Sequence, residues 1–423
     1  MKTLKNVFCD KPGDVIPTGY IGALDGIRAL AILTVAHFHL WQQSWLTISF
    51  QTPKLEKFGI SNISLDWIQR YGSFFVDMMI LLTGFCLFLP YARYMVEGGE
   101  KRPGLPDRYE VRNFYIKRIA RIVPSYYFCT LVYLFVFILP SKNYASVGEF
   151  FKDESLWHQL FANMTFTQNL SAETYISTPF NGALWTVAVE MQFYLIFPFL
   201  AWCFRKKPML TYFVTVGVSY WYIQFKVVPM EDGEFRWHLN QMPALLCVFA
   251  TGMLGALIFV SLANNMKRQR FTGVLFTVLA IASFMAVRFI LKKGPGSMNN
   301  LRWQLQLRFL LAIFYLLICI GVIFSVKWFR RIFDNKIMHF LAGISYNLYI
   351  WHQVIAVQLK THKIPYWEGE TLPNIANNRP WMYKYTLIAV LAAFLAAVAV
   401  TYLIEKPCAK LINKLTKIRR KEY

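Results

Sequence analysis

An apolar stretch near the start of the chain contains ionisable side chains at a spacing that suits proton transfer. Residues 24–39 include Arg28, His37 and His39. In a helix Arg28 and His39 share one face about 16 Å apart, because eleven residues make close to three turns. His37 falls on the opposite face, toward lipid or a neighbouring helix. Imidazole titrates near neutral pH, so His39 is a candidate general base; a helix-packing hydrogen bond is its alternative interpretation.

Further ionisable residues occur in later apolar runs at a depth similar to that of His39. A rise of about 1.5 Å per residue places Asp77, Glu190 and His352 in the outer half of the membrane, where they can meet His39. Glu190 or Asp77 is predicted to orient His39, because a carboxylate on the second imidazole nitrogen fixes the tautomer. For His352 the alternative is an interfacial imidazole within an aromatic belt. Glu405, at the end of the last predicted span, is expected at the cytoplasmic mouth of the helix bundle.

Apolar runs of membrane length recur along the whole chain and determine its architecture. Of the 423 residues, 56% are hydrophobic, which predicts an all-α integral membrane protein with about ten transmembrane helices. One polytopic membrane domain is expected over 21–410, between an N-terminal tail (1–20) and a basic C-terminal tail (411–423). The predicted spans begin near Ile21, Gly72, Phe114, Ala183, Met209, Gln241, Phe271, Trp303, Ile337 and Tyr385.

The formal net charge of +22 is spread between the spans rather than gathered in a nucleic-acid-binding patch. Lys and Arg concentrate in alternate loops, beginning with the N-terminal tail, so both termini are expected in the cytoplasm and nucleic acid is excluded as a partner. A basic patch that includes Arg118 and Arg121 opens the third span; from charge alone it is an ordinary positive-inside anchor. The seven cysteines are scattered without a CxxC pair, so we predict small buried hydrophobes and no metal site.

Six short segments stand in order along the chain: 24–28 with His39, 76–85, 118–124, 184–194, 344–352 and 404–407. Together they resemble the motifs of the acyltransferase-3 family of polytopic membrane acyltransferases, with Thr83 in place of the usual serine of the second motif. The resemblance covers nearly the whole chain. It implies transfer of an acyl group, usually acetyl from coenzyme A, to a hydroxyl of an extracytoplasmic glycan or other cell-envelope acceptor. It also implies a multi-pass protein of the bacterial plasma membrane.

The resemblance implies a role for each residue that matches a motif. His39 would deprotonate the acceptor hydroxyl or carry the acyl group transiently, and the sequence leaves both routes open. Arg28, Arg118 and Arg121 would bind the phosphates of acyl-CoA, the donor substrate, by charge-assisted hydrogen bonds. The remaining matched residues are assigned to the substrate pocket (Trp185, Tyr194, Thr83 and His352) and to the mouth of the site (Asp25 and Glu405).

Two other classes of function compete with this interpretation. A proton-coupled exporter of an anionic metabolite would use His39 and Glu190 as a proton relay, but the chain lacks the paired Gly/Pro-broken spans of an inverted repeat. A scaffold or receptor would leave Arg28, Asp77 and Glu190 without a purpose. Many members of the family carry a soluble esterase-like domain. This sequence ends without one, so we expect the acceptor to meet the membrane domain directly or through a separate extracytoplasmic protein.

Overall fold

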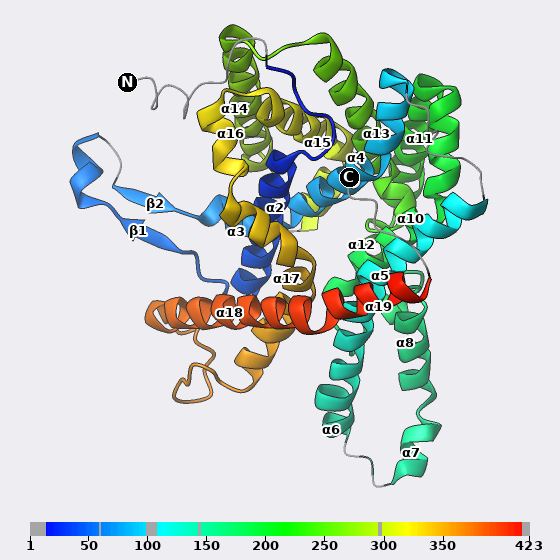
Figure 1. Ribbon diagram of the computed structural model, residues 1–423. Coiled ribbons are helices and arrows are strands. Elements are labelled where there is room, and N and C mark those ends of the chain that lie inside the picture. Colours follow the sequence, from blue (N-terminus) through cyan, green and yellow to red (C-terminus); the bar gives the residue numbers. More distant parts are fainter. Residues whose placement is uncertain are drawn as a thin grey trace.

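Helices account for nearly all the regular structure of the protein (Figure 1). The computed structural model describes residues 14–58, 61–98, 108–142, 144, 146–294 and 298–416, so most of the predicted N-terminal tail and the end of the predicted C-terminal tail lie outside it. The predicted all-α class is confirmed. The long helices are α2 (Gly22–Ser44), α4 (Phe75–Glu97), α5 (Arg108–Val132), α10 (Trp185–Lys206), α11 (Pro208–Trp221), α13 (Met242–Asn265), α14 (Arg270–Lys292), α15 (Met298–Phe324), α17 (Lys336–Thr361) and α18 (Arg379–Val400).

Short elements connect or extend these helices. One small antiparallel hairpin, β1 (Ser49–Gln51) with β2 (Asn62–Ser64), projects from the bundle, with Ser49 opposite Ser64 (Figure 1). The short helices are α3 (Asp66–Tyr71), α6 (Leu139–Lys142), α7 (Val147–Lys152), α8 (Glu154–Met164), α9 (Ala172–Ile176), α12 (Asp232–His238), α16 (Lys327–Phe333) and α19 (Lys406–Leu415). The 3₁₀ and π segments are η1 (Pro53–Phe58), η2 (Gly72–Phe74), η3 (Tyr133–Ile138), η4 (Gly182–Leu184), η5 (Tyr222–Val227) and η6 (Thr401–Glu405).

Eight helical stretches among the described residues are long and apolar enough to cross a membrane. They match eight of the ten predicted spans. The other two predicted spans also fold as helices: α11, which continues into η5, and α17. Helix α17 is less apolar because its buried residues include Ser345, Asn347 and His352, yet it packs closely against α2 and α18 within the bundle.

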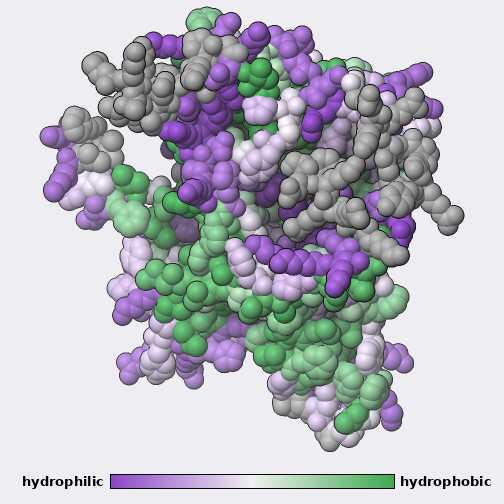
Figure 2. Space-filling view, in the orientation of Figure 1, coloured by the Kyte–Doolittle hydropathy of each residue, from purple (hydrophilic) through white to green (hydrophobic). Residues whose placement is uncertain are grey.

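The surface of the bundle is apolar where lipid would contact it. Figure 2 shows hydrophobic side chains gathered over the lower middle of the molecule, while hydrophilic side chains lie mostly above them. Large apolar side chains are exposed along several long helices, among them Phe213 on α11, Phe271 on α14 and Leu395 on α18. Apolar exposure on this scale is typical of a surface that faces a membrane.

Helices α4 and α13 form the most extensive helix contact in the structure. Gly84 on α4 lies against the carbonyl of Phe249, and Gly252 on α13 lies against the carbonyl of Leu81, so that a Cβ at either glycine would overlap backbone atoms. Glycine permits the close backbone approach by which helices commonly associate in lipid, where no hydrophobic effect drives them together. This contact fixes the position of α4, which forms one wall of the site described below.

A buried ion pair joins α4 to α15. Nε of Arg308 donates to Oδ2 of Asp77 at 3.0 Å, and both side chains are almost completely buried. Nη1 of Arg308 also donates to the carbonyl of Leu239 at 2.8 Å. The prediction that Asp77 orients His39 is not met by this geometry, because α4 turns the carboxylate toward α15 and the carboxylate is bound there by Arg308.

We expect Asp77→Asn to lower the free energy of unfolding by about 3–5 kcal/mol, because the Arg308 guanidinium would remain buried without a counter-charge. The double variant Asp77→Leu with Arg308→Met removes both charges and is expected to recover most of the lost stability. Thermal unfolding of the purified protein in detergent, followed by tryptophan fluorescence, measures both effects. An equal loss in the single and double variants would contradict a stabilising ion pair.

Candidate active site

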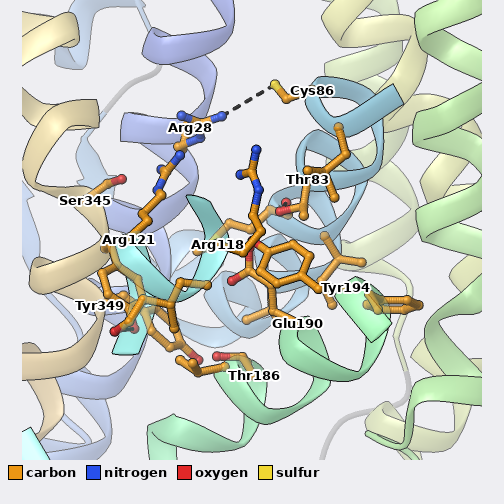
Figure 3. A pocket seen from close by; sticks show the side chains of 18 residues that line it. Arg28, Thr83, Cys86, Arg118, Arg121, Thr186, Glu190, Tyr194, Ser345 and Tyr349 are labelled. Carbon is orange, nitrogen blue, oxygen red and sulfur yellow. Dashed lines mark hydrogen bonds between the residues drawn. The ribbon is translucent and has the colours of Figure 1, made fainter. Parts of the chain in front are cut away.

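Five helices, α2, α4, α5, α10 and α17, line a partly open cavity of about 220 Å³. Arg28 reaches it from α2, Arg118 and Arg121 from α5, and Glu190 and Tyr194 from α10 (Figure 3). The three arginines predicted to bind an anion therefore line one space, although they come from two segments far apart in the sequence. We call this space the arginine cavity.

The guanidinium groups of the arginine cavity keep hydrogen-bond donors available for a ligand. Arg118 and Arg121 share a face of α5 because they are three residues apart. The Arg118 guanidinium lies over the ring of Tyr194 at 5.6 Å, and its Nε is buried without a partner. Arg121 makes no hydrogen bond or ion pair with another described residue. Arg28 is held loosely, 3.7 Å from Asp25. Three guanidinium groups in one cavity, one of them with a buried Nε that has no partner, favour the binding of phosphate or carboxylate groups.

Glu190 lies inside the arginine cavity rather than beside His39. The hydroxyl of Tyr194, one helical turn later, donates to the Glu190 carboxylate, which confirms that these two residues share a face of α10. The prediction that Glu190 orients His39 is not met, because the rotation of α10 directs its carboxylate toward Tyr194. Among the residues that line the cavity, one carboxylate stands against three guanidinium groups, so the lining carries a net positive charge. Asp25 lies near Arg28 and Glu405 lies near Arg121, but neither is among the described residues that line the cavity.

His39 instead meets a second histidine. Nδ1 of His39 and Nε2 of His352 are 2.8 Å apart, and His352 is completely buried. Nδ1 of His352 lies 2.7 Å from the carbonyl oxygen of Tyr349. We call His39 and His352 the imidazole pair. The burial of His352 and its bond to His39 contradict the alternative of an interfacial imidazole.

The hydrogen bonds of the imidazole pair assign its protons. A carbonyl oxygen can only accept, so Nδ1 of His352 carries a proton, and Nε2 of His352 must accept in the neutral ring. Nδ1 of His39 is therefore the donor between the two rings, which leaves the lone pair on Nε2 of His39. The tautomer that a general base needs is thus set by an imidazole, where a carboxylate was predicted.

His37 occupies the other face of α2, as the helical phase predicts. Its Nε2 is buried without a hydrogen-bond partner. His37 and His39 are only two residues apart, yet they lie on different faces of α2. Only His39 therefore contacts His352.

The remaining residues predicted for the substrate pocket divide into two groups. Thr83 lines the arginine cavity, although its hydroxyl donates to the carbonyl of Met79 at 3.1 Å. Trp185 and His352 are not among the described residues that line it. Trp185 packs edge-on against Tyr175, with ring centroids 6.4 Å apart.

The two residues predicted at the mouth both join helices. The Asp25 carboxylate accepts a hydrogen bond from Tyr20, whose pKa is raised by burial and by this carboxylate, and it lies 3.3 Å from Nδ1 of His339 on α17. Glu405 accepts a hydrogen bond of 2.7 Å from Nδ2 of Asn347, also on α17. The start of α2 and the segment η6, which follows α18, are thereby both attached to α17.

Several residues that line the arginine cavity were missed from the sequence. Cys86 accepts a hydrogen bond from Nη2 of Arg28 at 3.5 Å, whereas a buried hydrophobic role was predicted for every cysteine. Ser345 and Tyr349 line the cavity from α17. Ser345, Tyr349 and His352 follow one another at intervals of four and three residues, and this helical periodicity within the motif 344–352 was the signal that would have found them.

Comparisons with known proteins identify the family of the chain. A family model described as an acyltransferase domain matches residues 21–406. The chain belongs to this acyltransferase family. Its curated relatives include the peptidoglycan O-acetyltransferase OatA of Listeria monocytogenes, which is 24% identical over 420 residues, 96% of this chain and 58% of that protein. A Staphylococcus aureus protein with a provisional assignment as an O-acetyltransferase is 25% identical over 373 residues, 79% of this chain and 50% of that protein.

The extent of these matches differs between relatives. The chain spans about half the length of the two bacterial relatives. A protein of the Acidianus two-tailed virus, provisionally assigned as an acetyltransferase, is 22% identical over 329 residues, 77% of this chain and 80% of that protein. No solved structure matches the chain. The resemblance drawn from the six motifs is thus confirmed, and the protein is a multi-pass membrane acyltransferase by family.

Cys86 provides a test of the charge in the arginine cavity. In a variant whose other cysteines are replaced by serine, we expect an anionic methanethiosulfonate reagent to modify Cys86 about tenfold faster than a cationic reagent of similar size, because the guanidinium groups concentrate anions. Arg118→Gln in the same background should reduce this preference. Intact-protein mass spectrometry measures both rates, and equal rates for the two reagents would contradict a cationic cavity.

Proposed function

We propose that this protein transfers an acyl group, acetyl in the simplest case, from cytoplasmic acyl-CoA to a hydroxyl of an extracytoplasmic envelope acceptor. Peptidoglycan is the first acceptor to consider, because a relative is named for its O-acetylation. The asymmetry of Lys and Arg supports a plasma-membrane protein with both termini in the cytoplasm. The observation that carries the proposal is that Tyr349 lines the arginine cavity while its ring centroid lies 5.6 Å from that of His352, so the cavity ends beside the imidazole pair.

The arginine cavity suits the donor. Arg28, Arg118 and Arg121 would donate to the diphosphate and 3′-phosphate of acyl-CoA, as planar guanidinium groups commonly bind phosphate. The pantetheine arm would then extend along the face of α2 from Arg28 to His39, about 16 Å at the helical rise per residue. The negatively charged part of the donor thereby stays near the cytoplasm and the thioester reaches the imidazole pair.

His39 would act as the general base of the transfer. Nε2 of His39 accepts the proton of the acceptor hydroxyl while that oxygen attacks the thioester carbonyl. The bond between carbonyl carbon and sulfur then breaks, and His39 returns the proton to the leaving thiolate, which gives an ester and free coenzyme A. His352 keeps the Nε2 lone pair of His39 available by accepting the hydrogen bond from Nδ1–H of His39.

A covalent route would use the same nitrogen as a nucleophile. Nε2 of His39 would take the acyl group and release the thiol, and the acceptor hydroxyl would attack afterwards. Only this route exchanges labelled coenzyme A into acetyl-CoA when no acceptor is present. We expect no such exchange, because the proposed base acts on the acceptor hydroxyl.

Replacement of the two histidines of α2 tests the proposal directly. We expect His39→Ala to lower kcat by about 10²–10⁴-fold, the usual contribution of a general base, with the fold retained. His37→Ala should leave transfer largely intact, because His37 lies on the other face of the helix. The measurement mixes purified protein with radiolabelled acetyl-CoA and peptidoglycan fragments, and follows label in the glycan together with free thiol.

The outcomes of this assay separate the competing functions. Equal loss of transfer in both variants would contradict the assignment of His39 by helical phase. Absence of thiol release and of labelled product with the wild-type protein would favour the exporter of an anionic metabolite.

His352 is proposed as a positioning residue that acts through His39. We expect His352→Phe to lower kcat at least about tenfold while KM for acetyl-CoA stays unchanged, because the arginines are untouched. His352→Gln should restore part of the activity, since its amide can donate to the Tyr349 carbonyl and accept from His39. Steady-state kinetics with both variants check this, and an equal rise in KM for both would contradict a positioning role.

A further inference from the structure

Tyr349 contacts the arginine cavity, the segment η4 before α10, and the imidazole pair. Its side chain is only 3% exposed and lines the cavity. The hydroxyl donates to the carbonyl of Ala183 at 3.1 Å. The Tyr349 carbonyl accepts from Nδ1 of His352, and the two rings lie against each other. The phenol ring therefore stands where the cavity ends and the imidazole pair begins.

The arginine cavity has two unlike ends. Figure 3 shows the guanidinium groups of Arg28, Arg118 and Arg121 toward one end, with Thr186 and Tyr349 toward the other. Phosphates bound by the guanidinium groups would direct the rest of a donor toward Tyr349. The reactive thioester and the acyl chain would then reach the phenol ring first.

The end of the arginine cavity near Tyr349 is held rigidly. Besides the hydrogen bond from Tyr349 to Ala183, Nδ2 of Asn181 donates to the carbonyl of Ile350 at 2.7 Å. Two hydrogen bonds thus attach the segment before α10 to consecutive residues of α17. A side chain held at both its hydroxyl and its backbone, in a close-packed interior, cannot yield easily to added volume.

We propose that the Tyr349 ring limits the size of the acyl group that the protein transfers. The ring leaves room for an acetyl group to reach His39 and excludes longer chains, whose extra methylenes would overlap the phenol. This inference rests on the proposed acyl-CoA-dependent transfer and adds a specificity-determining residue to it. The residue acts at the acyl end of the donor, whereas the arginines act at the phosphate end.

The experiment compares acetyl-CoA, butyryl-CoA and hexanoyl-CoA as donors, with free thiol and acyl-labelled peptidoglycan fragments as products. We expect Tyr349→Ala to raise the ratio of kcat/KM for hexanoyl-CoA to that for acetyl-CoA by about tenfold or more, the scale on which apolar pockets discriminate methylenes. Tyr349→Leu, which keeps apolar packing at smaller volume, should shift the ratio in the same direction. Tyr349→Phe retains the ring and should keep the preference for acetyl.

The matched control is Tyr346, one turn earlier on α17. Tyr346 also lines the arginine cavity, and its hydroxyl donates to the carbonyl of Ile122 on α5 at 3.0 Å. Tyr346→Ala opens a similar volume there. The turnover of this variant can fall, but its ratio of kcat/KM for hexanoyl-CoA to kcat/KM for acetyl-CoA should stay at the wild-type value.

The outcomes distinguish this inference from the function on which it rests. Suppose that the wild-type protein turns over acetyl-CoA, but that folded Tyr349→Ala or Tyr349→Leu keeps the wild-type ratio of kcat/KM for hexanoyl-CoA to that for acetyl-CoA. This result would overturn the size limit and leave the proposed function intact. An equal shift in Tyr346→Ala would also overturn it, since any enlargement of the cavity would then suffice. Absence of turnover by the wild-type protein with every donor would refute both the function and the size limit.

Discussion

The hydrogen bond between the imidazoles of His39 and His352 is the contact on which the arrangement of the candidate site depends. A polar group buried without a partner costs free energy, and the interior of a membrane-spanning bundle offers few partners. His352 satisfies both of its ring nitrogens, one at the carbonyl of Tyr349 and one at His39. This requires α2 and α17 to lie at a matched depth and rotation, which their close packing provides.

The same cost explains where the buried carboxylates lie. Asp77 neutralises Arg308, a cation that would otherwise be buried alone. Glu190 accepts from Tyr194 in a cavity that holds three guanidinium groups. His39 is consequently left with a neutral partner. An imidazole orients His39 as a carboxylate would, but it adds no fixed negative charge where the proposed acyl-CoA donor, with its several phosphates, would approach.

Helix α17 connects the two parts of the site. Ser345 and Tyr349 face the arginine cavity, and His352 continues the same face to the imidazole pair. The arginine cavity and the imidazole pair are therefore two neighbouring regions along one helix, and Tyr349 belongs to both. The opposite wall is α4, whose glycine contact with α13 fixes its position. The arginine cavity and the imidazole pair, which we propose for donor binding and for proton transfer, are thus held at a constant separation.

The sequence by itself determined the membrane architecture, the shared face of Arg28 and His39, and the residues that supply the cavity's positive charge. These depend on local properties: apolar length predicts a spanning helix, and spacing within one helix predicts which side chains share a face. Depth along the membrane also placed Asp77, Glu190 and His352 near the level of His39. Which of the three touches His39 depends on which helices are neighbours and how each is rotated about its axis. Only the tertiary structure decided that α17 lies beside α2 and turns His352 toward His39, while α4 turns Asp77 toward α15.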